Sequence, residues 1–176
     1  MPKLEIGLVQ VYTGNGKGKT SAAFGLALRA AGRGLRVYII QFIKGGFDYG
    51  ELYVAEKIPN IRLRAFGRGK FITENPPEKE DVKLAEDALR LAKDVVRSGE
   101  YDIVILDEIN VALDLKLIDL EETLKMIKSK PAHVELVLTG RSAPDRIIEA
   151  ANLVSEVKEI KHPFKEGYKS RCGIEY

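Results

Sequence analysis

The sequence contains no tryptophan, two histidines and a single cysteine, Cys172. A lone cysteine cannot form an intrachain disulfide, and such usage is typical of proteins kept in a reducing cytoplasm. No apolar run approaches the ~20 residues of a membrane-spanning helix, and the first residues lack the apolar core of a signal peptide. The formal net charge is only +2, so no charge excess favours nucleic acid or an anionic membrane. We therefore expect a cytoplasmic protein with neither kind of partner.

What is present is typical of one globular domain. The 176 residues are 45% hydrophobic and 31% charged, enough to bury a substantial core. Strand-length apolar runs alternate with segments of helical period, which favours a mainly parallel sheet of about six strands with helices on both faces. The expected strands are 8–12, 36–42, 61–65, 103–106, 134–139 and 154–160, and the expected helices are 22–31, 78–97, 120–127 and 144–151. We expect residues 1–176 to form a single α/β domain.

A glycine-rich loop lies between the first expected strand and the first helix. Glycines let backbone N–H groups approach a polyphosphate, and the helix N-terminus adds a partial positive charge. Lys19 would reach the phosphates and Thr20 would offer its hydroxyl to Mg²⁺. This strand–loop–helix context predicts a P-loop NTPase-like (RecA-like) domain. The residues expected to bind the nucleotide here are Gly14, Asn15, Gly16, Lys17, Gly18, Lys19, Thr20 and Ser21.

The loop departs from the usual pattern in two ways. A P-loop begins with glycine, followed by four spacers and Gly-Lys-Ser/Thr. Here the first position is Thr13 and the nearest glycine is Gly14, so the cradle is either one residue shorter or closed by a threonine. A second lysine, Lys17, lies inside the loop. Both departures indicate that the phosphates are held differently from those in an ordinary ATPase.

Charged residues follow two later strands. In open α/β sheets ligands bind beyond the carboxyl ends of the strands, and Asp107 and Glu108 come directly after a buried apolar run. This is the usual place for an acidic group that orients Mg²⁺ beside a phosphate loop. In a hydrolase the second acid would activate water. Arg141, after the fifth expected strand, would place a guanidinium against phosphate oxygens.

Several segments spread over the chain match the motifs of a known family. They are the loop 13–25, the segments 41–45, 106–108 and 138–141, and a tail with Lys161-His162-Pro163-Phe164, Gly167 and Gly173-Ile174-Glu175-Tyr176. Together they resemble the corrinoid (cob(I)alamin or cob(I)yrinic acid a,c-diamide) adenosyltransferases of the P-loop type, over nearly the whole chain. In that family the third strand is followed by glycines and Phe-Thr-Trp. This chain has Gly67, Gly69 and Phe71 there, but no tryptophan.

The resemblance implies that ATP and a reduced corrinoid are the substrates. In that family the Co(I) centre attacks the 5′ carbon of the ribose, and the whole triphosphate leaves. The corrinoid supplies the nucleophile, so no protein nucleophile or general base is required. The resemblance further implies Mg²⁺ (or Mn²⁺) as the metal, a reductase or flavoprotein that supplies Co(I), and a homodimer.

The resemblance also implies roles for the residues singled out above. Lysines and backbone N–H groups would stabilise the charge that grows on the departing phosphates. We expect Lys19, Lys17 and Glu108 to act in catalysis, Thr20, Glu108 and Asp107 to hold the metal, and Arg141 and Phe71 to contact the substrates. From the residues alone two alternatives stay open. One is a P-loop kinase or ATPase acting on another small substrate, and the other is a non-catalytic ATP-dependent switch.

Overall fold

The computed structural model of this chain describes residues 4–46, 48–70, 72 and 77–176. One sheet holds six strands in the order β3-β2-β4-β5-β1-β6, and all neighbouring strands run parallel. The strands are β1 Val9–Thr13, β2 Val37–Gln41, β3 Ile61–Ala65, β4 Ile103–Asp107, β5 Glu135–Thr139 and β6 Leu153–Glu156. The sheet expected from the alternating pattern is thus confirmed, and these six strands are parallel throughout.

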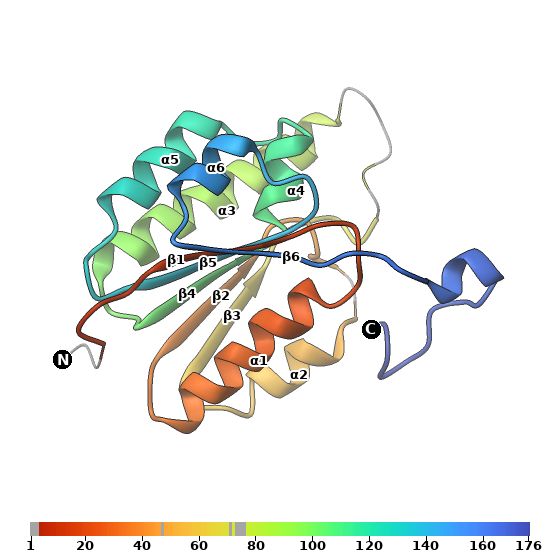
Figure 1. The fold of residues 1–176 in the computed structure, drawn as a ribbon, viewed down its shortest axis with the longest axis horizontal. Helices are drawn as coiled ribbons and strands as arrows, with labels where there is room; N and C mark the ends of the chain where they lie inside the picture. The colour runs from red at the N-terminus through yellow and green to blue at the C-terminus, as the bar shows by residue number, and fades with distance from the viewer. Residues whose placement is uncertain (1–3, 47, 71, 73–76) are drawn as a thin grey trace.

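Helices cover both faces of the sheet (Figure 1). Two pack on one face, α1 Lys19–Gly32 and α2 Gly50–Ala55. The other face carries α3 Lys79–Ser98, α4 Ile109–Asp114, α5 Leu120–Ser129 and α6 Asp145–Ala150. Each layer encloses its own cluster of buried apolar side chains. Among the described residues, no helix has both the length and the apolar character needed to cross a bilayer.

The middle of the sheet is packed on both faces. All residues of β4 and β5 are buried, as expected for parallel strands covered on both faces. On one side α1 presents Ala23, Ala27 and Ala30 to the sheet, and these small side chains let the helix lie close to it. The loops that follow β4, β5 and β1 therefore start from strands that are held by packing on both faces of the sheet.

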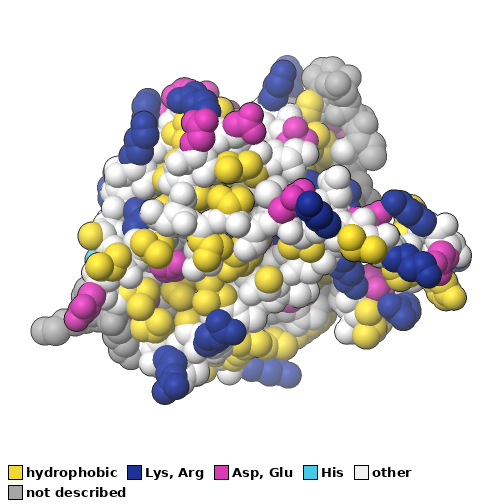
Figure 2. All heavy atoms as spheres, in the orientation of Figure 1, with side chains coloured by type: hydrophobic (Ala, Val, Ile, Leu, Met, Phe, Trp, Pro, Cys, Tyr) yellow, Lys and Arg dark blue, Asp and Glu magenta, His cyan; other side chains and the backbone are white. Residues whose placement is uncertain are grey.

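The last part of the chain differs most from the sequence prediction. The sixth strand ends at Glu156 instead of continuing to 160, because the next residue turns onto the P-loop: Val157 N donates to Thr13 O, and Val157 O accepts from Gly16 N, both at 2.8 Å. Beyond it an arm, residues 158–176, projects from the body and includes the short 3-10 helix η1 Pro163–Glu166 (Figure 1). Charged and apolar side chains lie side by side on the surface of this arm (Figure 2).

Candidate nucleotide site

The candidate site lies at the carboxyl edge of the sheet, where three strands end side by side. β5 separates β1, which leads into the P-loop, from β4, which ends in Asp107. The last residue of β5, Thr139, donates a hydrogen bond from Oγ1 to Asp107 Oδ1 at 2.7 Å. Across it, Thr20 of α1 donates from Oγ1 to the same oxygen at 2.9 Å. The fold therefore joins the P-loop and the acidic strand end as the sequence predicted.

The P-loop begins one residue later than the usual pattern. Thr13 is the last residue of β1, and its Oγ1 accepts from Ala143 N at 3.2 Å. Gly14, with a φ of 95°, makes the first turn. Of the two alternatives left open by the sequence, the structure thus has the shorter loop, with Thr13 anchoring its base. Because Gly16 N is bonded to Val157 O, that N–H is not directed at a ligand.

The N-terminus of α1 is suited to an anion. Gly18 precedes the helix with a φ of 120°, a conformation that side chains rarely adopt. The first turn of α1 contains no acidic residue, whereas the first turns of α3 and α5 each contain two. Carboxylates at those helices offset the positive end of the dipole, and at α1 that end stays available. The helix therefore favours a phosphate at its start.

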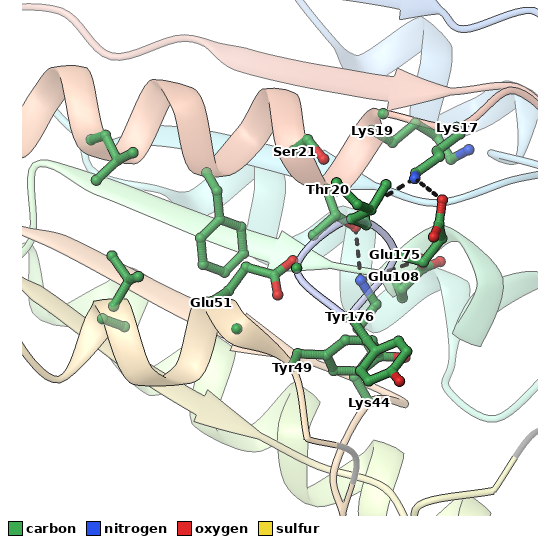
Figure 3. A pocket seen from close by; sticks show the side chains of 18 of the residues that line it. Lys17, Lys19, Thr20, Ser21, Lys44, Tyr49, Glu51, Glu108, Glu175 and Tyr176 are labelled. Atoms are coloured by element: carbon green, nitrogen blue, oxygen red, sulfur yellow. Dashed lines mark hydrogen bonds and ion pairs between the residues drawn. The ribbon is translucent and has the colours of Figure 1, made fainter. Parts of the chain in front are cut away.

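The two loop lysines point in different directions. Lys19 is 7% exposed, and its Nζ donates to Gly16 O at 2.6 Å. Burial lowers the pKa of Lys19, with the nearby Glu108 opposing that shift. Lys17 is exposed and binds the end of the arm instead: its Nζ lies 2.9 Å from Glu175 Oε1 and 3.1 Å from Ile174 O (Figure 3). Lys17 is thus held beside the loop by a carboxylate.

Asp107 is the centre of the polar network, and it has no exposed surface. Besides the two threonine hydroxyls, its other oxygen, Oδ2, accepts from Gln41 Nε2 at 3.1 Å and from Lys44 Nζ at 2.9 Å. Burial alone would raise the pKa of Asp107. The positive charge of Lys44 and the donated hydrogen bonds outweigh it and hold that pKa below its ordinary value. Four donated hydrogen bonds and the adjacent ammonium thus stabilise the ionised form of this buried carboxyl.

Glu108 turns its carboxylate toward the P-loop from an unusual backbone conformation. It has a φ of 63°, in the left-handed region, and its N–H donates to Thr139 Oγ1 at 3.0 Å. Burial and the charge of Asp107 raise the pKa of Glu108. A strained residue with a shifted pKa at a strand end is typical of a functional position.

Lys44 was assigned no role of its own from the sequence, although its segment follows a predicted strand and was part of the resemblance. Its Nζ donates to Thr20 Oγ1 at 2.8 Å and lies 3.8 Å from Glu108 Oε1 (Figure 3). Burial opposes its charge, but Asp107 and Glu108 keep the pKa of Lys44 above its ordinary value. This partly buried ammonium balances the two acids.

A cavity of about 580 Å³ opens between these groups and the arm. The predicted residues that line it are Gly16, Lys17, Gly18, Lys19, Thr20, Ser21, Glu108 and Arg141. Asp107 is buried behind Thr20 and Lys44, and Gly14 and Asn15 are outside the lining. Phe71 lies outside the described residues.

The cavity also has walls that the sequence analysis missed. α1 and α2 contribute an apolar stretch of the cavity wall with Phe24, Leu28 and Val54. Glu51 of α2 points into the cavity (Figure 3). The arm closes the opposite side with His162, Gly173, Ile174, Glu175 and Tyr176. In the sequence, only the tail motif pointed to this wall, because a segment at the chain end that matches the family suggests a role at the site. The cavity is thus polar at the P-loop and apolar between the helices.

Comparison with known proteins decides which family carries this site. The sequence profile of the family described as ATP:corrinoid adenosyltransferase BtuR/CobO/CobP matches residues 5–176. The chain belongs to this family. The corrinoid adenosyltransferase of Pseudomonas aeruginosa is 38% identical over 98% of this chain and 85% of its own length. Those of a Sinorhizobium species and Escherichia coli K12 are 40% and 35% identical over 98% of this chain, and 81% and 87% of their own lengths.

The resemblance drawn from the sequence motifs is therefore confirmed, and the kinase or ATPase alternative is not favoured. Among solved structures, a KaiC-like protein from Pyrococcus horikoshii superposes with a TM-score of 0.54 at 18% identity, covering 89% of this chain and 75% of that one. At this identity the likeness concerns the fold alone. It agrees with the P-loop NTPase-like architecture of this corrinoid adenosyltransferase.

Proposed function

We propose that this chain transfers the 5′-deoxyadenosyl group of ATP to the Co(I) centre of a reduced corrinoid and releases triphosphate. The observation that carries the proposal is family membership over 5–176, joined to a P-loop that opens into a cavity of about 580 Å³. The polar end of the cavity suits the triphosphate, and the apolar stretch between α1 and α2 suits the nucleoside. Residues 1–176 would form one adenosyltransferase domain.

The P-loop groups would act on the leaving triphosphate. As the cobalt–carbon bond forms, the bond between the 5′ carbon and its oxygen breaks, and the electron pair goes to the triphosphate. Lys19 and the N-terminus of α1 are preorganised to stabilise that growing charge. Lys17 would exchange Glu175 for a phosphate oxygen, and Arg141 lines the cavity as a further cation.

Three oxygen-bearing side chains would hold Mg²⁺ (or Mn²⁺): Thr20, Asp107 and Glu108. Their fit is supported by Lys44, whose ammonium already lies within 2.8–3.8 Å of all three. Magnesium is commonly bound by one or two carboxylates together with substrate phosphates. When bound, the metal would neutralise charge on the leaving triphosphate. Glu108 would hold the metal or the ribose, since no base is needed.

Further parts of the proposal concern the surroundings of the enzyme. A reductase or flavoprotein would supply the Co(I) state, and Phe71 would face the corrinoid. A homodimer would cover apolar side chains of the edge strand β6, in which Leu153 and Val154 are 42% and 41% exposed. A cytoplasmic location would suit the reduced corrinoid and the exposed thiol of Cys172.

The proposal is tested by mixing the protein with ATP, Mg²⁺ and a chemically reduced corrinoid. The absorption spectrum should change to that of the cobalt–adenosyl product. Lys19→Ala should slow this change about 10²–10³-fold, whereas a conservative substitution of an exposed lysine far from the site, Lys83→Arg, should leave its rate unchanged. ATP consumption without any cobalt–carbon product would contradict the proposal.

A further inference from the structure

The backbone at Lys44 is held in place by its neighbours, whereas its long side chain reaches the cavity. Phe42 is fully buried, and its N–H donates to Asp107 O at 3.0 Å. On the other side, Gly45 N donates to Phe66 O at 2.6 Å, and a Cβ at Gly45 would lie only 2.6 Å from Gly67 N. The backbone at Lys44 is thus fixed between two packed residues. The long side chain, which lines the cavity, is the part that can change position.

The Lys44 ammonium occupies oxygen atoms of Thr20 and Asp107 that a metal would need as ligands. An ionised carboxylate offers about four lone-pair sites, and Asp107 already accepts from Thr20, Thr139, Gln41 and Lys44. Thr20 donates its own proton to Asp107 and accepts from Lys44. A metal can therefore contact these oxygens only after one donor has left.

Lys44 is the donor most able to leave. Gln41 and Thr139 are 1% and 0% exposed and belong to β2 and β5, the strands on either side of β4, so their positions are set by the sheet. The side chain of Lys44 is 14% exposed at the cavity wall. The ring of Tyr49, whose centroid lies 5.5 Å from Lys44 Nζ, offers a second environment for the cation.

We propose that Lys44 is an internal counter-ion that competes with a divalent metal for the oxygens of Thr20, Asp107 and Glu108 in the nucleotide-free protein. This inference rests on the metal role in the proposed function and deepens it. Like charges repel at this distance, so the ammonium and the metal exclude one another. A triphosphate in the cavity would receive the displaced ammonium. Metal and ATP should therefore bind together much more tightly than the metal binds alone.

The test measures binding of Mn²⁺ alone to the nucleotide-free protein by electron paramagnetic resonance. Lys44→Met removes the competing charge with little change in side-chain volume, so it should bind Mn²⁺ at least about tenfold more tightly than the wild type. Lys57→Met, which removes an exposed lysine after α2, is the matched control and should bind Mn²⁺ like the wild type. Equal affinities in Lys44→Met and the wild type would overturn the proposal.

A second measurement covers the case in which Lys44→Met does not fold, since the variant leaves a buried carboxylate without its cation. In the wild type, acylation of Lys44 can be followed by mass spectrometry. It should be slow without metal and faster with saturating Mg²⁺, and a rate that Mg²⁺ leaves unchanged would overturn the proposal. Formation of the cobalt–adenosyl product in the same preparation separates the two failures. If the product forms but Mg²⁺ does not change the acylation rate of Lys44, the proposed function stands and this inference fails.

Discussion

Replacing Asp107 with asparagine should destabilise the protein strongly, because the carboxylate is an acceptor for four donors. It is fully buried and accepts from Thr20, Thr139, Gln41 and Lys44. Asparagine keeps the volume of the side chain but turns one oxygen into an NH₂ group. In place of Oδ2 that group would face Gln41 Nε2 and Lys44 Nζ, which can only donate. In place of Oδ1 it would face two threonine hydroxyls that already accept from Lys44 Nζ and a backbone N–H.

The size of the loss follows from the contacts that disappear. Two buried donors lose their acceptor, at about 1–3 kcal/mol each. Lys44 also loses its ionised partner, and only Glu108, at 3.8 Å, remains beside it. Removing one partner of a buried ion pair typically costs about 3–5 kcal/mol. This figure includes part of the cost of the lost hydrogen bonds, so the two are not added. We therefore expect Asp107→Asn to lower the free energy of unfolding by about 3–5 kcal/mol.

Urea unfolding followed by circular dichroism would measure this loss, with equal slopes in both proteins as the check that the transitions are comparable. Asp114→Asn is the matched control, because this carboxylate is exposed at the end of α4. It should change the free energy of unfolding by less than about 0.5 kcal/mol. A loss below about 1 kcal/mol for Asp107→Asn would refute the conclusion that Asp107 is an ionised, fully bonded carboxylate.

Three further substitutions test the roles proposed for the P-loop and the arm. Lys19→Ala should lower turnover at saturating ATP about 10²–10³-fold in single-turnover assays, and near-wild-type turnover would contradict a phosphate-binding role. Glu108→Gln should lose activity only in part and regain some of it with excess Mg²⁺, whereas a complete, metal-insensitive loss would point to a base. Glu175→Gln should tighten ATP binding about two- to fivefold in calorimetry, because Lys17 no longer has to leave a carboxylate. Arg171 and then Lys17 lower the pKa of Glu175 to about 2, so the arm contact should be complete above the ordinary carboxyl pKa and weaken as the pH falls toward 2. An unchanged affinity for ATP in Glu175→Gln would show that Lys17 does not face the nucleotide.

The sequence predicted the sheet and the phosphate loop well, because both depend on local patterns. Continuous apolar runs predict β4 and β5, which are buried along their length. Apolar residues at helical spacing in 78–97 predict α3. The short helices α2 and α4 were missed. Each has only six residues, too few for a helical period to show, and tertiary packing stabilises them.

The site was harder to predict where contacts join distant parts of the chain. The structure brings Asp107 and Thr20 into contact, because the parallel strands that precede them end at one edge of the sheet. The contact of Lys17 with Glu175 joins residues 158 positions apart, and no local sequence pattern predicts it. Lys44 was noticed only as part of a loop, since its position over Asp107 depends on how the Gly45 and Gly67 segments pack.

The central claim is that the 5′ carbon of ATP is attacked and that the three phosphates leave together. Phosphorus NMR of a reaction with ATP, Mg²⁺ and a reduced corrinoid tests it most directly, because a kinase or ATPase would break a phosphorus–oxygen bond instead. We expect free triphosphate to accumulate one-for-one with the cobalt–adenosyl product measured by absorption in the same sample. ADP or orthophosphate as the stoichiometric product, with the corrinoid unchanged, would contradict the claim.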